Sequence, residues 1–189
     1  MNHADQSSNL ASATLGTGCF WCTEAIFDQL KGVHSVIPGY SGGHVEHPTY
    51  EAVCDKKTGH AEVIRVEYDP QQINFADLLD VFWQTHDPTT LNRQGNDVGP
   101  QYRSVIFYHD EQQKQIAEAS LRQTDAGGLW PNPIVTEVSP LINFYKAEDY
   151  HQKYYERVGG RNAYCTYVVK PKVEKFEKQF KDRLKDGVR

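Results

Sequence analysis

The order of elements that this sequence predicts is typical of an α+β domain of the ferredoxin-like split βαβ class, a βαββαβ sandwich with a helical extension at its C-terminal end. Two observations lead to this prediction. Segments with two-residue alternation and segments with a 3.6-residue period follow one another as strand, helix, strand, strand, helix, strand. A length of 189 residues suits one domain, so residues 1–189 are expected to form a single unit. We therefore expect an antiparallel sheet with two helices on one face.

Four main strands are predicted from short segments that end at turn-forming residues. In chain order they cover residues 11–17, 33–40, 61–68 and 102–108. A weaker strand is expected over residues 134–138. Residues 89–100 are rich in Gly, Asn and Pro, and this composition predicts a loop.

Helices are predicted where apolar residues recur every three or four positions. They cover residues 19–31, which Gly32 should close, then a helix from residue 75, and then 111–124, 147–157 and 171–189. A shorter helix or turn is expected over 48–54. The clearest helix has Asn74 as its N-cap and an apolar stripe made of Phe75, Leu78, Leu79, Phe82 and Trp83. The last helix has Pro171 at its first position and an apolar face made of Val173, Phe176, Phe180 and Leu184.

Composition excludes several classes of function. The formal net charge is -5, and no run of Lys or Arg is long enough to predict nucleic-acid binding. No apolar segment approaches the roughly 20 residues that span a bilayer. The first residues lack a charged segment followed by an apolar one, as an export signal would have, so we expect a cytoplasmic protein. The polar residues 1–12 are expected to be flexible. We also expect a monomer. Its four cysteines are too few for a disulfide scaffold.

A pair of cysteines marks the junction between the first strand and the first helix. In Gly18-Cys19-Phe20-Trp21-Cys22, Cys19 lies at a helix N-terminus, where the positive end of the helix dipole should lower the thiol pKa. Cys22 lies three residues further on, about 5–6 Å away at Cβ, and a small adjustment could close a disulfide. Phe20 and Trp21 between them predict an apolar slot suited to a methyl or thioether group.

Three other interpretations of the C-x-x-C pair stay open at this point. A zinc site needs two further ligands, but Cys54 and Cys165 are isolated and the histidines show no ligand spacing. A thioredoxin-like disulfide oxidoreductase would have a different order of elements. A non-enzymatic redox sensor or metal-binding module would be indicated by stoichiometric zinc in the purified protein. We expect no metal and assign no role to Cys54.

Glu62 is the candidate acid. It lies two, four and six residues before Ile64, Val66 and Tyr68 in the third predicted strand. Because alternate side chains of a strand share one face, Glu62 is expected on the same apolar face. A carboxyl group there would be partly desolvated and could stay protonated near neutral pH, as a general acid requires. Alternation alone leaves open that Glu62 reaches water at the start of the strand.

Several segments, in the right order, resemble the A class of peptide methionine sulfoxide reductases. They are GCFWC from Gly18, PGYSGG from Pro38, PTYEAVC from Pro48, TGHAEVIRVEYDP from Thr58, FWQTHDPTTLNRQGNDVGPQYRSVIFY from Phe82 and FYKAEDYHQKYY from Phe144. The resemblance covers residues 14–171.

The resemblance implies a set of roles and partners. Cys19 would be the nucleophile and Glu62 the acid that protonates the sulfoxide oxygen. Phe20 and Trp21 would hold the substrate methyl group, with Tyr50, Asp97 and Tyr102 on the polar side. The substrate would be the S epimer of methionine sulfoxide, free or in oxidised proteins, and the reductant thioredoxin. No cofactor is implied.

The chain departs from the commonest family pattern at Cys22, where many members have glycine. We expect Cys22 to resolve the Cys19 sulfenic acid to a disulfide because it needs no loop movement. Cys165 is the alternative resolving cysteine, because it fits a C-terminal position that the family also uses.

Overall fold

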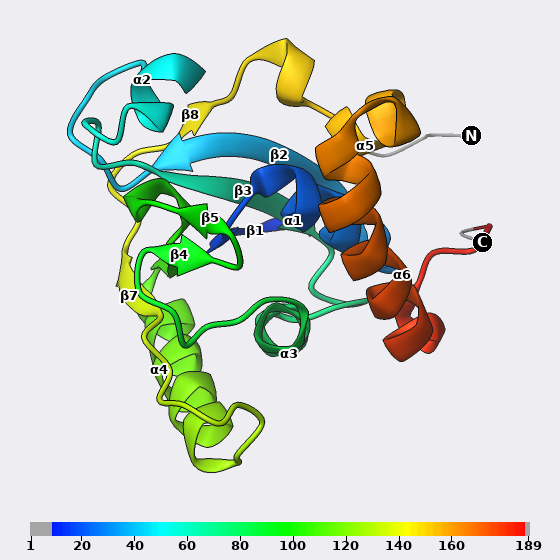
Figure 1. The fold of residues 1–189 in the computed structure, drawn as a ribbon. Helices are drawn as coiled ribbons and strands as arrows, with labels where there is room; N and C mark the ends of the chain where they lie inside the picture. Colours follow the sequence, from blue (N-terminus) through cyan, green and yellow to red (C-terminus); the bar gives the residue numbers. More distant parts are fainter. Residues whose placement is uncertain (1–8, 188–189) are drawn as a thin grey trace, which may run out of the picture.

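The computed structural model describes residues 9–187 and is built on a mixed sheet (Figure 1). The sheet has six strands in the order β7-β6-β1-β3-β2-β8. Their bounds are β1 Ala11–Thr17, β2 Val33–Ser41, β3 Ala61–Tyr68, β6 Ser104–Tyr108, β7 Glu137–Pro140 and β8 Tyr145–Lys146. Each of the four main strands that the sequence predicts is present.

The pairing within the sheet is antiparallel except at one edge. β3 pairs antiparallel with both β1 and β2, and β6 pairs antiparallel with β1. The expectation of a fully antiparallel sheet is wrong because β7 joins β6 in parallel. The chain reaches β7 through the long helix α4, Glu111–Ala126, which returns it to the same end of the sheet.

The helices gather on one face of the sheet. α1, Phe20–Phe27, and α3, Phe75–Thr85, both lie under it, and α4 lies beside α3 (Figure 1). The main core fills this interface, and its fully buried side chains include Leu15, Phe27, Ile64, Leu78 and Phe82. The opposite face carries a smaller cluster of Ala61, Val63, Val105 and Phe107, which Leu141 and Phe144 partly cover.

The predicted helix at residue 75 is confirmed in detail. Asn74 accepts a hydrogen bond from the backbone N–H of Asp77, and the Asp77 carboxylate accepts one from the Asn74 N–H. This reciprocal pair satisfies two backbone donors at the helix start, where a good N-cap contributes about 1 kcal/mol. The predicted apolar stripe is buried against the sheet.

Other boundaries differ from the prediction for local reasons. The first helix ends at Phe27 rather than at Lys31, and Gly32, with φ 89°, belongs to the following turn. The predicted loop over 89–100 contains a short hairpin of β4, Arg93–Gln94, and β5, Asp97–Val98. The weak strand is shifted to Glu137–Pro140. Residues 48–54 do contain a short helix, α2, over Tyr50–Cys54.

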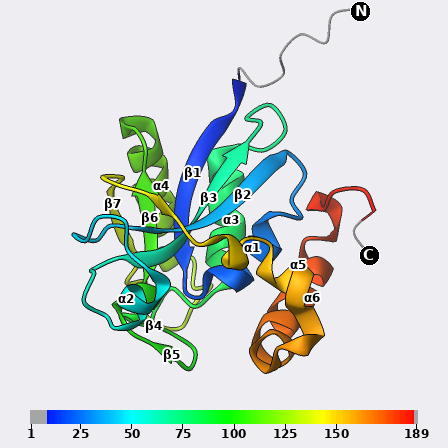
Figure 2. The ribbon, with the colours of Figure 1, turned by 90° about the horizontal axis from the view of Figure 1, so that it is seen from above.

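The C-terminal part is more broken than the sequence predicts. A helix over 147–157 is replaced by a 3-10 turn at Asp149–His151 and a short α5 at Tyr154–Val158, because Lys153 takes a left-handed conformation with φ 55°. A π-helical turn at Cys165–Val169 then leads into α6, Lys170–Gln179. Figure 2 shows α5 and α6 beside α1.

The predicted helix over 171–189 is wrong over residues 180–187, and residues 188–189 lie outside the described part of the chain. A 3-10 turn follows at Lys181–Arg183, and Leu184 forms a strand-like bridge to Leu30 instead of continuing a helix. Val173, Phe176 and Phe180 are buried as expected. Most of the segment predicted to be flexible, residues 1–8, lies outside the described residues, and β1 begins at Ala11. No helix between residues 9 and 187 has the length and apolar character to cross a bilayer.

Candidate active site

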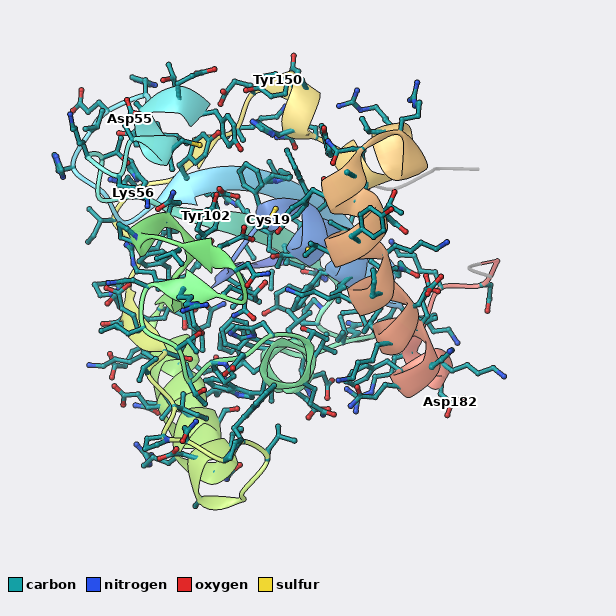
Figure 3. The ribbon with its side chains drawn as sticks, viewed as in Figure 1. Cys19, Asp55, Lys56, Tyr102, Tyr150 and Asp182 are labelled. Carbon is teal, nitrogen blue, oxygen red and sulfur yellow. The ribbon has the colours of Figure 1, made fainter. Side chains whose placement is uncertain are left out.

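Cys19 is the N-cap residue of α1, at the point where β1 turns into the helix. The turn requires Gly18, which has φ 104°. A Cβ at residue 18 would also lie 2.7 Å from the Cβ of Gln94, so no larger residue fits there. The β4–β5 hairpin therefore packs directly on the residue that precedes the thiol (Figure 3).

Glu62 is buried beside Cys19. Only 2% of Glu62 is exposed, and the backbone N–H of Phe20 donates to its Oε1 at 3.2 Å. Burial raises the pKa of Glu62 well above its usual value, and the negative charge that Cys19 can carry raises it further. The alternation argument for Glu62 is confirmed, and the alternative in which it reaches water is wrong.

An aromatic wall stands next to the two groups. Phe20 is fully buried, and its ring lies 5.7 Å from that of Tyr40. The Trp21 indole is stacked on Tyr154, with ring centroids 3.9 Å apart and planes 8° apart. Its Nε1–H donates to Nδ1 of His151 at 3.0 Å. Trp21 is thus held in one orientation by its stacking and its hydrogen bond together.

Three polar residues complete the surroundings of Glu62. Burial raises the pKa of both Tyr50 and Tyr102, and the nearby Glu62 carboxylate raises each further. Asp97, on β5, accepts a hydrogen bond of 2.5 Å from the Tyr164 hydroxyl. The structure thus brings Tyr50, Asp97 and Tyr102 to one site with Cys19; Figure 3 shows Cys19 and Tyr102 near its centre.

The thiols differ from the sequence expectation in one respect. All four cysteines are free, and Cys19 is half-buried. Burial raises the pKa of the Cys19 thiol, and its hydrogen bond with the Cys22 thiol raises it further. The prediction that the helix N-terminus lowers this pKa is wrong, because desolvation by burial exceeds the lowering by the Trp21 backbone N–H.

Cys22 and Cys165 both lie close to Cys19. Cys22 is in contact through the hydrogen bond between the two thiols. Cys165, in the π-helical turn, is fully buried, and the charge of Cys19 contributes to raising its pKa after burial, the larger cause. Both candidate resolving cysteines are therefore neighbours of Cys19. Cys54 interacts with the Tyr50 hydroxyl on the other side of Glu62.

Comparison with known proteins identifies the family. The family model described as peptide methionine sulfoxide reductase matches residues 11–184. A relative named peptide methionine sulfoxide reductase MsrA from Saccharolobus solfataricus is 54% identical over 173 residues, covering 92% of this chain and 96% of the relative. The chain belongs to the peptide methionine sulfoxide reductase family. It is accordingly an enzyme that reduces methionine sulfoxide.

Further family members agree in sequence and in fold. MsrA of Ralstonia nicotianae is 53% identical over 179 residues, covering 93% of each chain. The structure of Mxr1 from Saccharomyces cerevisiae in reduced form superimposes with a TM-score of 0.74 at 34% identity, covering 85% of this chain and 92% of Mxr1. Mxr1 in complex with Trx2 matches with a TM-score of 0.53 at 26% identity, covering 82% of this chain and 92% of that one.

Sequence reasoning about this reductase missed some residues that hold the site in place. Tyr164 bonds to Asp97 and also contacts the Cys19 thiol. Glu148 accepts hydrogen bonds from the Tyr40 hydroxyl at 2.9 Å and from the Tyr50 backbone N–H at 3.1 Å. His151 accepts a hydrogen bond from the Trp21 indole, a contact that the spacing of the histidines does not predict. The match of FYKAEDYHQKYY to the family is the only signal for Glu148 and His151, and Tyr164 lies outside that segment.

The reductase fold offers no evident place for a metal in its described part. Between residues 9 and 187, no three His, Cys, Asp or Glu side chains are close enough together to hold a metal ion.

Proposed function

We propose that this reductase acts on the S epimer of methionine sulfoxide, free or in oxidised proteins, with Cys19 as the nucleophile, and so repairs those proteins. The observation that carries the proposal is the placement of Cys19, Glu62 and the aromatic wall around one point. The hydrogen bond from the Phe20 N–H to Glu62 joins the acid to the first turn of the helix that begins at Cys19.

Phe20 and Trp21 would receive the methyl group of the substrate, because they form the apolar side of the site. Tyr50, Asp97 and Tyr102 would hold its polar side. The fixed Trp21 indole and the buried Phe20 ring support this assignment. An apolar slot on one side and proton donors on the other distinguish the two epimers of a sulfoxide, because each epimer places its oxygen differently.

In the first step, the Cys19 sulfur attacks the sulfoxide sulfur while Glu62 gives a proton to the sulfoxide oxygen. Since Oε1 of Glu62 accepts the Phe20 N–H, Oε2 is the oxygen left to carry the proton. The sulfur–oxygen bond of the substrate breaks, and Cys19 ends as a sulfenic acid. The substrate sulfur gains two electrons and the Cys19 sulfur loses two. Glu62 recovers its proton from the Cys19 thiol.

In the second step, the Cys22 thiol attacks the Cys19 sulfenic acid, so that water leaves and a disulfide forms. Thioredoxin would then reduce the disulfide by exchange. The complex of the related Mxr1 with Trx2 supports this partner. Cys165 remains the alternative resolving cysteine. No cofactor enters the cycle.

We also propose that the protein is a monomer of the cytoplasm, where free thiols persist. We assign the core sheet to the ferredoxin-like class, because the order β6-β1-β3-β2 supports it.

A single-turnover assay tests the function. The reduced protein is mixed with one equivalent of pure S or R epimer, without reductant, and methionine and free thiols are counted. We expect one methionine and the loss of two thiols with the S epimer, little change with the R epimer, and no methionine from Cys19→Ser. Equal turnover of both epimers, or methionine release by Cys19→Ser, would contradict the proposal.

A further inference from the structure

A left-handed residue lies between the two groups that hold Trp21. Lys153 has φ 55° and ψ 34°, a conformation that costs a residue with a side chain roughly 1–2 kcal/mol. Two residues before it, His151 accepts the Trp21 Nε1–H, and directly after it Tyr154 stacks on the Trp21 ring. The conformation of Lys153 therefore decides where both partners of Trp21 stand.

A carboxylate of α1 holds this turn. Glu24 is only 3% exposed, and its Oε2 accepts the Lys153 backbone N–H at 3.0 Å. The Tyr154 N–H also lies near it and helps to lower its pKa. The Lys153 ammonium lies 2.5 Å from the Asp28 carboxylate at the end of the same helix. Glu24 does not belong to the reacting groups, yet α1 carries both Glu24 and Trp21.

We propose that Glu24 is a positioning residue for sulfoxide binding, which fixes the left-handed turn at Lys153 and thereby sets His151 and Tyr154 against Trp21. This rests on the proposed role of Trp21 in holding the substrate. Without the carboxylate, the Lys153 backbone N–H loses its acceptor and the left-handed conformation loses its compensation. The turn then relaxes, and the Trp21 ring gains freedom.

The charge of Glu24 adds a second readout. Burial raises the pKa of Glu24 to about 7, against the opposing effects of the Lys153 N–H and its ammonium, while Asp28 raises it slightly. A carboxyl group with a raised pKa favours the docked turn at low pH and loses that contribution as pH rises through 7. Lys153 and Asp28 are the charged groups that face it. Substrate binding should therefore weaken between pH 6 and pH 8.

Three variants test the proposal. Glu24→Ala should raise KM for methionine sulfoxide roughly 5- to 10-fold, with kcat changed less than twofold. Glu24→Gln keeps an acceptor without charge, so its KM should stay near the wild-type value at pH 6 and should not rise by pH 8. Asp80→Asn is the matched control, because it removes an ion pair with Arg183 that includes neither Glu24 nor Lys153.

A spectroscopic readout is independent of turnover. The chain has three tryptophans, so incorporation of fluorotryptophan gives three ¹⁹F resonances, and Trp21→Phe identifies one of them. Glu24→Ala should shift or broaden the Trp21 resonance alone. Should Glu24→Ala fail to fold, Lys153→Val tests the same turn, because β-branched residues disfavour positive φ. An unchanged Trp21 resonance in Glu24→Ala, or in Lys153→Val where that variant replaces it, would overturn the proposal. A loss of kcat with KM constant would do so too. Wild-type turnover in the same assay tests the proposed function separately.

Discussion

The backbone N–H of Phe20 donates to the Glu62 carboxyl group, and this hydrogen bond of 3.2 Å connects the central strand β3 to the start of α1. A side chain from one element thus takes up an amide that the helix itself leaves unpaired. The same carboxyl group lies beside Cys19, whose charge would raise its pKa further. This contact therefore places Glu62, the proposed acid, next to Cys19, the proposed nucleophile.

Glu62→Gln should slow the reduction step by roughly 100-fold or more, because glutamine accepts the Phe20 N–H but has no acidic proton to transfer. Glu62→Ala should be slower still, since it also leaves that N–H without an acceptor. The measurement is methionine release in rapid-quench single turnovers. A Glu62→Gln variant with the wild-type rate would remove Glu62 from the mechanism.

Glu62→Gln should also stabilise the folded protein at alkaline pH. Burial raises the pKa of Glu62, so its contribution to stability is present at low pH and is lost as pH rises through the folded-state pKa. Glutamine carries no charge at any pH and avoids this loss. The melting temperature of Glu62→Gln should exceed that of the wild type at pH 8 by more than at pH 5.

Cys22→Ser and Cys165→Ser form a matched pair for the resolving step. Cys22→Ser should release one methionine per chain and then stop, because the variant lacks the thiol that lies next to Cys19 and would resolve its sulfenic acid. Cys165→Ser should continue to cycle with thioredoxin. Steady-state turnover with the thioredoxin system measures both, and the reverse pattern would assign the resolving role to Cys165.

Tyr164→Phe should make Cys19 harder to ionise. Burial raises the pKa of the Cys19 thiol, and the Tyr164 hydroxyl is among the contacts that lower it, because its single proton can turn from Asp97 to the Cys19 sulfur. Removal of that hydroxyl should shift the pH dependence of Cys19 alkylation to higher pH, measured in a Cys22→Ser, Cys165→Ser background. Tyr155→Phe is the control, because Tyr155 lies on α5 without contact to Asp97 among the described hydrogen bonds.

His86 should make the fold sensitive to acid. Burial lowers its pKa to about 4, and its Nδ1–H must donate to the Phe82 carbonyl, so Nε2 accepts from Ser104. A histidine with a lowered pKa contributes stability above its unfolded pKa of 6.5 that is lost as pH falls towards 4. Between pH 7 and pH 4.5, the wild type should lose about 2–3 kcal/mol more unfolding free energy than His86→Gln.

Denaturant titrations at the two pH values measure this difference. His34→Gln, which replaces an exposed histidine, is the control and should follow the wild type. A His86→Gln variant that loses as much stability in acid as the wild type would contradict the assignment.

Local patterns in the sequence were enough to predict the parts of the fold that depend on neighbouring residues. The side of β3 that carries Glu62 follows from two-residue alternation, and the start of α3 at Asn74 follows from capping chemistry. The position of Cys19 at a strand-to-helix turn also depends only on adjacent residues. These expectations are confirmed.

Contacts between distant segments could not be predicted in this way. The partner of the Tyr164 hydroxyl is 67 residues away in the chain, and that of the Trp21 indole is 130 residues away. The left-handed Lys153 breaks a pattern that is otherwise helical, because carboxylates from α1 compensate its cost. The raised pKa of Cys19 depends on desolvation, which only the assembled site determines.

The strand that carries Glu62 is hydrogen-bonded on both sides, to β1 and to β2, and Glu62 stands opposite Tyr40 in that ladder. Insertion of one residue between Glu62 and Tyr68 would turn the carboxyl group to the far face of the sheet and leave Cys19 without its acid. Insertions in the surface loops carry no such penalty. Length variation among functional homologues should therefore concentrate in those loops and be absent from β3.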